Sequence, residues 1–403
     1  MRIAVVSSGH VPSQWAHSVA VAKNANGFAQ LGHDVELLTV ERLSERRHRR
    51  EISSVTDYYG IDPSIDVRFF PDRTPYYVQD VGPLGLALDA LTYATFGVAR
   101  RVADPERTIA AHCADAGVDL CYCRSYRAVN YAVERGVPTV METHTPRIRK
   151  PSLKRAVRNS TSPQFRLLVT ISERLKENFV DAGVPEEKVA VLQDGVDLAQ
   201  FDAAPDKHTA RERLSLPRDR DVVMYLGSLH ADKGIEHVLR VAARLPDRRF
   251  QLVGGSDDEV TKWRGVAADL DADNVHFSGY VENRLVPTYL AAADVLLMPY
   301  DTEREVTLMD LESTSPLKLF EYLASSRPVV SSDIPAVSRT VEHEHDALLA
   351  TPNDIDELTA LVERALDDGA LADRLSRNAY ETATRYSWRD RCERILSLAG
   401  VTE

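Results

Sequence analysis

The feature that most constrains this chain is a repeated order of buried strand, loop, helix and buried strand. Residues 2–7 are apolar and β-branched, and a Ser-Ser-Gly-His loop follows them. A helical stretch over 17–31 ends at Gly32, and Val35–Val40 is typical of a second buried strand. Strand–helix–strand units in which a glycine ends the helix indicate a parallel sheet covered by helices.

The same order continues along the chain. Further strands are predicted at Leu120–Arg124, Pro138–Glu142, Leu167–Ile171, Val189–Leu192, Val222–Leu226, Phe250–Val253, Val275–Phe277, Val295–Met298 and Val329–Ser331. The pattern starts again after Asp194-Gly195-Val196-Asp197, and at roughly 100–200 residues per domain 403 residues exceed one core. The sequence therefore predicts an α/β protein of two doubly wound halves, whose ligands bind at the carboxyl ends of the strands.

Composition excludes several classes of protein. The 49 basic and 61 acidic residues give a net charge of −12, which argues against a nucleic-acid binder. No apolar run approaches the roughly 18 residues of a membrane span, and the first residues lack the apolar region of a signal peptide. The chain has four cysteines that form no CxxC pair, at Cys113, Cys121, Cys123 and Cys392. They are expected to be buried thiols, and the protein is expected to be cytoplasmic and to lack a structural metal.

The most informative segment is SPLKLFEYLA at residues 315–324. Ser315 is a favourable N-cap and Pro316 suits the first helical position, so a helix should begin here. The amides of Leu317 and Lys318 would then lack partners in the helix, and the helix dipole adds about half a positive charge at that end. Such a helix end is a site for phosphate.

A carboxylate follows one turn beyond this phosphate site. Glu321 comes four residues after Leu317 and so lies on the same face of the helix. A nucleotide would explain both features, because its diphosphate would rest on the amides and its ribose hydroxyls would donate to the carboxylate. A capped core helix with a solvent-facing glutamate explains the segment about equally well.

A second segment, 224–234, carries a strand into a glycine turn at Gly227-Ser228, and Lys233 is expected to open the next helix. A lysine at a helix start opposes the dipole, at a cost of about 0.3 kcal/mol or more. A bound diphosphate would remove that conflict, whereas a solvated surface lysine is the alternative.

A third segment ends a strand of the first half. Alternate residues of a strand share a face, so Glu142 and His144 should point the same way. A histidine at such a strand tip can donate to a substrate oxygen, although a structural histidine is the commoner case.

Together these segments resemble the family 4 glycosyltransferases, which are retaining enzymes that use nucleotide sugars. The resemblance covers nearly the whole chain, and it depends on the order and spacing of many short pieces. Beyond those above, the pieces are Gly32-His33-Asp34-Val35, Ile171-Ser172-Glu173, Gln193–Asp197, Val275–Val281, Ala291–Pro299 and Tyr386-Ser387-Trp388.

The resemblance implies the GT-B fold, two Rossmann-like domains facing each other across a cleft that holds the sugar donor. The acceptor-side domain is then expected at residues 1–197 and the nucleotide-sugar domain at 198–386. A last helix at 387–403 would cross back to the first domain. No metal and no cofactor other than the donor are expected.

By the same match, Lys233 and the helix start at Ser315–Lys318 would contact the diphosphate, and Glu321 the ribose. Gly227 and Ser228 would form the phosphate-binding turn, and the main chain at Tyr280 and Val281 would hold the base. The expected catalytic residues are His144, Lys233 and Glu142. The acceptor hydroxyl is expected near Gly9, His10, Ser13, His17 and Arg124.

Two positions depart from the family pattern. Ser313 stands where a second glutamate usually precedes Glu321 by eight residues, and Ser228 stands where an arginine usually follows the turn glycine. The second change removes a cation from the diphosphate site, so Lys233 would carry more of that charge. A GT-B nucleotide-sugar epimerase and a non-catalytic sugar-nucleotide-binding protein stay open as alternatives.

A basic run follows His144 directly. Its members are Arg147, Arg149, Lys150, Lys154, Arg155 and Arg158. A solvated helix face explains the run, and the other interpretation is peripheral contact with an anionic membrane or a lipid-linked acceptor. The sequence gives no prediction of the oligomeric state.

Overall fold

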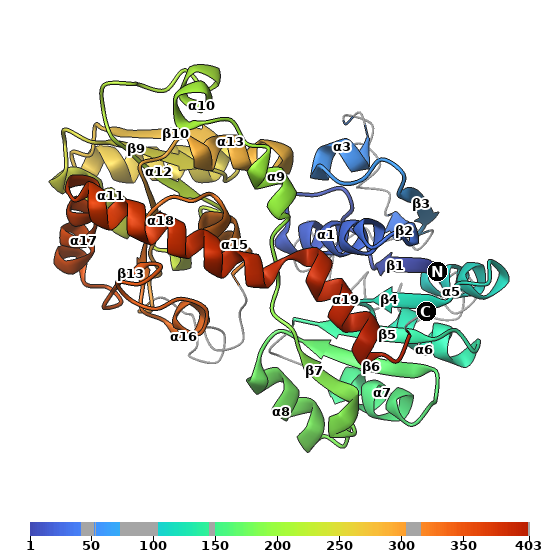
Figure 1. The fold of residues 1–403 in the computed structure, drawn as a ribbon. Coiled ribbons are helices and arrows are strands. Elements are labelled where there is room, and N and C mark those ends of the chain that lie inside the picture. The colour runs from blue at the N-terminus through green and yellow to red at the C-terminus, as the bar shows by residue number, and fades with distance from the viewer. Residues whose placement is uncertain (42–51, 53, 73–103, 145–149, 304–315, 402–403) are drawn as a thin grey trace, which may run out of the picture. The chain divides into compact units, whose positions relative to one another are not determined.

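The computed structural model describes residues 1–41, 52, 54–72, 104–144, 150–303 and 316–401 (Figure 1). Contacts divide the chain into two compact units. Unit 1 comprises Met1–Thr170, Lys176–Val191 and Cys392–Glu403, and unit 2 comprises Ile171–Leu175 and Leu192–Arg391. Each unit is built on its own sheet, as the repeated pattern predicts, while the domain boundaries expected at 197 and 386 stay predictions.

Unit 1 contains a sheet of parallel strands in the order β3-β2-β1-β4-β5-β6-β7. The strands are β1 (Arg2–Ser7), β2 (Asp34–Glu41), β3 (Asp66–Pro71), β4 (Leu120–Cys123), β5 (Thr139–Thr143), β6 (Phe165–Thr170) and β7 (Val189–Val191). Its helical segments are α1 (Ala16–Gln30), α3 (Val55–Tyr59), α5 (Pro105–Asp115), α6 (Tyr126–Glu134), α7 (Lys150–Ser160), α8 (Glu173–Asp181, which begins in unit 2) and η1 (Glu186–Lys188).

The central strands of unit 1 are buried along their whole length, which explains their continuous apolar sequences. The four cysteines are free and buried, as expected. The sequence did not predict β3, because this edge strand is half-buried and carries charged and apolar residues in turn.

Unit 2 contains a second parallel sheet, in the order β10-β9-β8-β11-β12-β13. The strands are β8 (Val222–Leu226), β9 (Arg249–Val253), β10 (Val275–Gly279), β11 (Val295–Met298), β12 (Val329–Ser332) and β13 (Leu348–Ala350). The helical segments are α9 (Leu198–Asp202), α10 (Lys207–Arg213), η2 (Ala231–Lys233), α11 (Ile235–Arg244), α12 (Asp257–Asp269), η3 (Asn283–Leu285), α13 (Val286–Ala291), α15 (Leu317–Ala324), α16 (Pro335–Ser338), α17 (Ile355–Asp367), α18 (Gly369–Ala383), η4 (Thr384–Tyr386) and α19 (Trp388–Leu398, which continues into unit 1).

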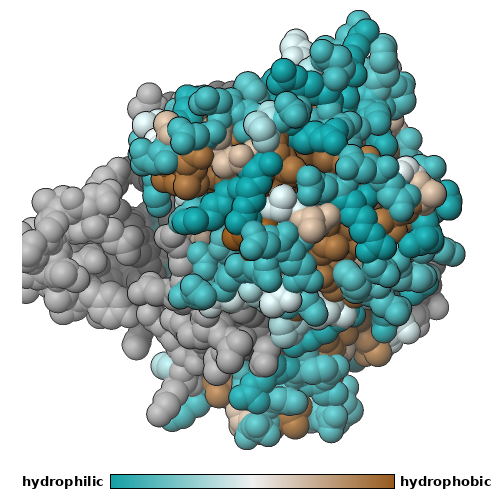
Figure 2. All heavy atoms as spheres, turned by 90° about the vertical axis from the view of Figure 1, so that its left-hand side faces the viewer, coloured by the Kyte–Doolittle hydropathy of each residue, from teal (hydrophilic) through white to brown (hydrophobic). Residues whose placement is uncertain are grey.

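Alternation along β8 builds two cores, one on each face of the second sheet. Met224 and Leu226 pack in one cluster with residues of α13 and α15, and Val223 and Tyr225 pack in the other with residues of α11 and α17. Because successive side chains of a strand point to opposite faces, one short strand serves both layers. The face seen in Figure 2 is mainly hydrophilic with small apolar groups between, as is usual for a protein surface.

The carboxyl ends of β8, β9 and β10 pack closely on one another. The Gly227 amide donates to the Val253 carbonyl at 2.9 Å, and the Gly254 amide donates to the Gly279 carbonyl at 2.7 Å. A Cβ on Gly254 would lie 2.0 Å from the Gly227 carbonyl oxygen, and its φ of +118° disfavours any other residue. The turn after β8 can therefore keep its place only while position 254 is glycine.

None of the described helices combines the length and apolar character needed to cross a membrane.

Replacing Gly254 by alanine tests the packing of these strand ends. The added methyl group must displace the Gly227 carbonyl, so we expect Gly254→Ala to lower the free energy of unfolding by about 3 kcal/mol. The control is Gly265→Ala, within α12, where an added Cβ meets nothing within 4 Å. That change should raise the free energy of unfolding by about 0.5–1 kcal/mol. Equal stability of the two variants in urea titrations would contradict the observed packing.

Candidate active site

The predicted donor residues of unit 2 gather at the carboxyl edge of its sheet. Tyr322 of α15 fixes this helix to β8, because its hydroxyl accepts from the Leu226 amide at 2.6 Å and donates to the Leu226 carbonyl at 3.1 Å. The Tyr225 hydroxyl donates to the Ser228 carbonyl at 2.7 Å. The start of α15 and the turn at Gly227 therefore lie beside each other, as a diphosphate bound to both requires.

The helix at residue 315 begins slightly later than the sequence predicts. Pro316 is the N-cap with φ −78° and ψ 100°, and Leu317 is the first helical residue, so the prediction of Pro316 at the first helical position is wrong by one residue. Ser315, the predicted cap, lies outside the described residues, as does Ser313. The amides of Leu317 and Lys318 occupy the first turn, where α-helix geometry gives them no partner within the helix.

Lys233 does not open a helix, contrary to the prediction. It ends the 3-10 turn η2, and Gly234, with φ 69°, separates it from α11, which begins at Ile235. A Cβ at Gly234 would lie 2.9 Å from the backbone of Pro299, so this separation is fixed by packing. The Lys233 ammonium lies 2.8 Å from Asp232 Oδ2 and 5.5 Å from the centre of the Tyr300 ring.

A second ammonium group, that of Lys318, lies against the same aromatic ring. Its Nζ is 5.2 Å from the centre of the Tyr300 ring and 4.5 Å from that of Tyr225, and it donates to the Tyr225 hydroxyl at 3.2 Å. Burial and the charge of Lys233 lower the pKa of Lys318 well below its usual value, and Asp232 partly opposes them. When both amines are protonated, two positive charges face one carboxylate, and an anion bound here would favour that protonated state.

The Lys318 side chain is a candidate site group that the sequence analysis does not single out. The sequence predicts a role only for its backbone amide, and places the conflict with a helix dipole at Lys233. In the structure that conflict belongs to Lys318, the second residue of α15. A lysine at this position was the signal that could have found it.

The remaining predicted donor residues are Glu321, Tyr280 and Val281. Glu321 lies one turn further along α15, and Tyr280 and Val281 follow β10, with the Tyr280 side chain 41% exposed. The structure places these residues at the same edge of the sheet, and their roles stay predictions.

In unit 1 a buried carboxylate joins the predicted catalytic residues. Glu142 of β5 is fully buried, His144 Nε2 lies 2.6 Å from its Oε1, and Arg124 Nε lies 3.8 Å from the same oxygen. Glu142 and His144 therefore point the same way, as predicted. A carboxylate on one ring nitrogen fixes the orientation of an imidazole, so Glu142 positions His144.

Two of the predicted acceptor residues, His17 and Arg124, lie close to this cluster. The Arg124 guanidinium donates to the His17 carbonyl at 3.3 Å. Burial lowers the pKa of His17 to about 3, with further lowering by Arg124, His144 and His10 that outweighs the opposite effect of Glu142. His17 is consequently neutral at physiological pH and can accept or donate a hydrogen bond.

The loop between β1 and α1, which carries Gly9, His10 and Ser13, is held by hydrogen bonds. The Tyr59 hydroxyl accepts from the Ser13 amide at 2.7 Å and donates to the Ser13 carbonyl at 2.9 Å. The Ser18 hydroxyl donates to the His10 carbonyl at 2.6 Å, and the Ser7 hydroxyl to the Gly9 carbonyl at 3.0 Å. The structure thus brings all five predicted acceptor residues to one edge of the first sheet.

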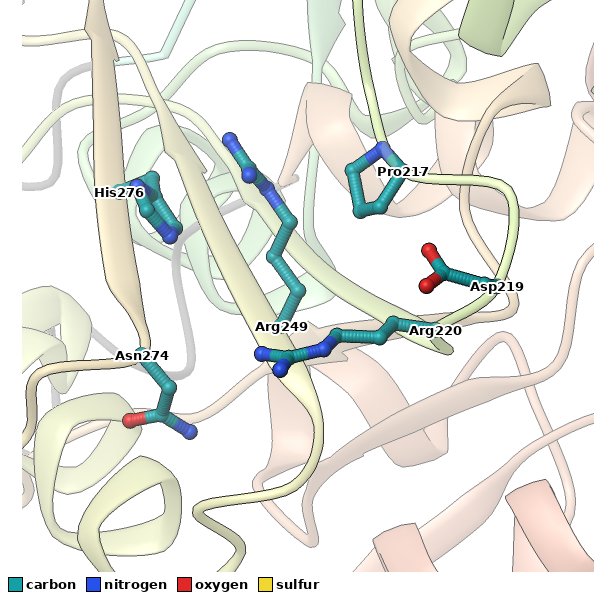
Figure 3. Close-up of a pocket in the computed structure, with 6 residues that line it drawn as sticks. All are labelled: Pro217, Asp219, Arg220, Arg249, Asn274 and His276. Carbon is teal, nitrogen blue, oxygen red and sulfur yellow. The ribbon is translucent and has the colours of Figure 1, made fainter.

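A pocket of about 170 Å³ in unit 2 lies at the other edge of its sheet (Figure 3). It is lined by Pro217, Asp219, Arg220, Arg249, Asn274 and His276. These residues precede or begin β8, β9 and β10, whereas the predicted donor residues follow the strands. The pocket therefore contains none of the predicted site residues.

The basic run is only partly described. Arg147 and Arg149 lie outside the described residues, and so does the side chain of Lys150. Lys154, Arg155 and Arg158 are exposed on α7, and the Arg158 guanidinium donates to Asn130 Oδ1. An exposed helix face of this kind accounts for these three cations, and membrane contact stays a prediction.

Two family models match the chain, one in each half. A model described as Glycosyltransferase Family 4 matches residues 18–200, and a model described as Glycosyl transferases group 1 matches residues 206–382. The chain therefore belongs to the family 4 glycosyltransferases, as the sequence resemblance indicates.

Relatives with this activity match much of the chain. The alpha-D-kanosaminyltransferase of Streptomyces kanamyceticus is 26% identical over 69% of this chain and 72% of its own length. The D-inositol 3-phosphate glycosyltransferase of Thermobispora bispora is 27% identical over 94% of this chain and 88% of its own. The Anabaena protein HepE, solved in complex with UDP and glucose, shares the fold over the full length of both chains, with a TM-score of 0.69 and 18% identity. The protein is thus a glycosyltransferase with the GT-B fold.

The neutral state of His17 predicts how stability depends on pH. The pKa of His17 is about 3 in the folded protein and about 6.5 in the unfolded chain. Above pH 6.5 this histidine is therefore neutral in both states. Below pH 6.5 only the unfolded chain takes up the proton. The free energy of unfolding therefore falls by about 1.4 kcal/mol for each pH unit between pH 6.5 and about pH 3.

A glutamine at position 17 stays neutral at every pH, so the variant should not lose this part of its stability as the pH falls. Between pH 7.5 and pH 5, we expect the free energy of unfolding of His17→Gln to rise by about 2 kcal/mol relative to wild type. Urea titrations at both pH values measure this change, and His208→Gln, at an exposed histidine, is the control. Parallel pH dependences of His17→Gln and wild type would show that His17 does not lose its proton on folding.

Proposed function

We propose that this glycosyltransferase moves a sugar from a UDP- or GDP-linked donor to a hydroxyl group of its acceptor, with retention of the anomeric configuration. The observation that carries the proposal is the pair of ammonium groups on Lys233 and Lys318, beside the start of α15. Without an anion, burial and the charge of Lys233 disfavour the protonated form of Lys318, and a diphosphate would supply the negative charge that favours it.

The donor would bind along the carboxyl edge of the second sheet. Lys233, Lys318 and the amides of α15 hold the diphosphate over the turn at Gly227-Ser228. Glu321 accepts hydrogen bonds from the ribose hydroxyls, and the main chain at Tyr280 holds the base. UDP in the complex of HepE supports a nucleotide donor for a chain of this fold.

Departure of the leaving group would dominate the chemistry. As the bond between the anomeric carbon and the diphosphate oxygen breaks, its electron pair passes to the diphosphate, and preorganised cations stabilise the growing charge. The acceptor oxygen forms the new bond on the same face of the sugar, and the departing phosphate oxygen takes the hydroxyl proton. His144, oriented by Glu142, holds the donor sugar, and the acceptor hydroxyl approaches near Gly9, His10, Ser13, His17 and Arg124.

A thermal-shift comparison of UDP-, GDP- and ADP-linked sugars tests donor binding. A ligand that binds only the folded state raises its stability by RT ln(1 + [L]/Kd), so the preferred donor should shift the melting temperature most. Release of nucleotide only with an acceptor supports transfer. Conversion of the donor alone, seen by NMR, would indicate an epimerase, and binding without turnover a non-catalytic protein.

Lys233→Ala tests the leaving-group assignment. Removing one dominant donor of positive charge should lower turnover by about 10²-fold or more. Nucleotide release from the preferred donor measures this loss. The control is Lys262→Ala, on α12, where the ammonium lies over Trp263. Turnover of Lys233→Ala within twofold of wild type would remove Lys233 from the mechanism.

Lys318→Met separates binding from stability. Methionine keeps most of the side-chain volume but needs no charge, so the ligand-free variant should gain about 1 kcal/mol of stability. The same change should weaken the binding of UDP by tenfold or more, because a charge-assisted contact is lost.

Thermal melts without UDP and calorimetric titrations with UDP measure the two effects of Lys318→Met. Opposite signs of the two changes mark a residue kept for ligand binding. A variant that is less stable and binds UDP as wild type does would show that Lys318 has a structural role.

A further inference from the structure

One tryptophan of the chain is exposed. The sequence has three, and Trp263 and Trp388 are 2% and 3% exposed, whereas Trp15 is 61% exposed. Trp15 is the N-cap residue of α1 and ends the loop that carries His10 and Ser13. The exposed indole therefore borders the predicted acceptor residues of unit 1.

The indole ring is held in place from one side. It stacks on the His10 ring, with ring centres 5.1 Å apart and planes 7° from parallel. The Trp15 amide donates to the Ser13 hydroxyl at 3.4 Å, and the Trp15 carbonyl accepts from the Ser18 amide at 2.8 Å. The face of the indole that does not meet His10 is left as a flat apolar surface on a fixed loop.

A fixed, exposed aromatic ring is suited to binding a ligand. Tryptophan offers a large contact area with few rotatable bonds, so little conformational entropy is lost when a partner covers it. Exposed tryptophan is otherwise an unfavourable surface residue, because its apolar area stays in water.

The polar surroundings of Trp15 define the chemistry of the partner. His10, on which the indole stacks, acts electrostatically on His17, and so do Arg124, Glu142 and His144. A ring that carries C–H groups on one face and hydroxyls around its edge matches both the apolar indole and the polar residues near it. Its C–H face would cover the indole, and its hydroxyls would bond to the polar groups. A lipid chain matches only the indole, because the other residues named are charged or polar.

We propose that Trp15 is the platform on which a ring of the acceptor, a pyranose or a cyclitol, stacks. This inference rests on the proposed glycosyl transfer and adds the chemical class of the acceptor. It assigns to Trp15 the binding of acceptor and not of nucleotide.

The fluorescence of Trp15 provides a direct test with the full chain. Iodide quenches exposed tryptophan, so the quenching lost in Trp15→Phe measures the signal of Trp15. The probes are methyl α-glucoside, maltose and myo-inositol at up to 100 mM, with glycerol as the open-chain control and vesicles of anionic lipid as a separate arm. We expect at least one ring compound to protect Trp15 from iodide, and glycerol and vesicles to leave the quenching unchanged.

Variants at position 15 test whether the aromatic face is the cause. For the protecting compound, Trp15→Ala should raise the dissociation constant tenfold or more by calorimetry, and Trp15→Phe should raise it less than threefold. The shift in melting temperature caused by UDP should be the same in both variants as in wild type.

Three results would overturn the inference: protection by none of the ring compounds, equal protection by glycerol, and protection by vesicles alone. Equal affinity of Trp15→Ala and wild type for the protecting compound would overturn it as well. If UDP did not raise the melting temperature of the wild-type protein, the proposed function would be contradicted instead. The two failures can therefore be told apart.

Discussion

The candidate site of unit 2 depends on how positive charge is held near Tyr300. Two ammonium groups, those of Lys233 and Lys318, lie 5.5 and 5.2 Å from the centre of its ring, and Asp232 supplies the carboxylate beside them. Aromatic faces attract cations, but each such contact contributes only about 0.5–2 kcal/mol. The ring therefore reduces the electrostatic cost of placing the two amines close together, but it does not neutralise their charge. An anionic ligand would instead stabilise the protonated form of both amines.

The fold holds this pair of amines in place with neutral groups. Tyr322 binds both backbone groups of Leu226, and Gly254 lets the turn after β8 approach its neighbour. Neither group adds charge, so the charged side chains of the site are Lys233, Lys318 and Asp232. Unit 1 follows another design, because there a buried carboxylate, Glu142, orients His144 and lies beside Arg124. The proposed transfer assigns the diphosphate to the first of these clusters and the donor sugar to the second.

Much of this architecture could be predicted from the sequence. Continuous apolar strands and glycine-ended helices predict two parallel sheets, since a strand buried on both faces needs apolar residues throughout. The edge strand β3 was missed because its residues alternate. The position of Glu142 beside His144 followed from strand periodicity alone.

The parts that could not be predicted depend on long-range packing. The helix near Lys233 begins two residues later than expected, because Gly234 packs against the backbone of Pro299, which lies 65 residues further on. In the same way, the contact of Lys318 with Tyr225 joins residues 93 positions apart. Local patterns carry no information on such distant partners. The exposure of Trp15 is of the same kind, since nothing in its neighbourhood of sequence marks it as exposed.

A crystal structure of the protein with UDP would test the central claim most directly. If the pair of amines is a diphosphate site, phosphate oxygens of UDP will lie within about 3.2 Å of Lys233 Nζ and Lys318 Nζ, above the start of α15. UDP bound in the basic pocket of Arg220, Arg249 and His276, with water alone at the two lysines, would contradict it.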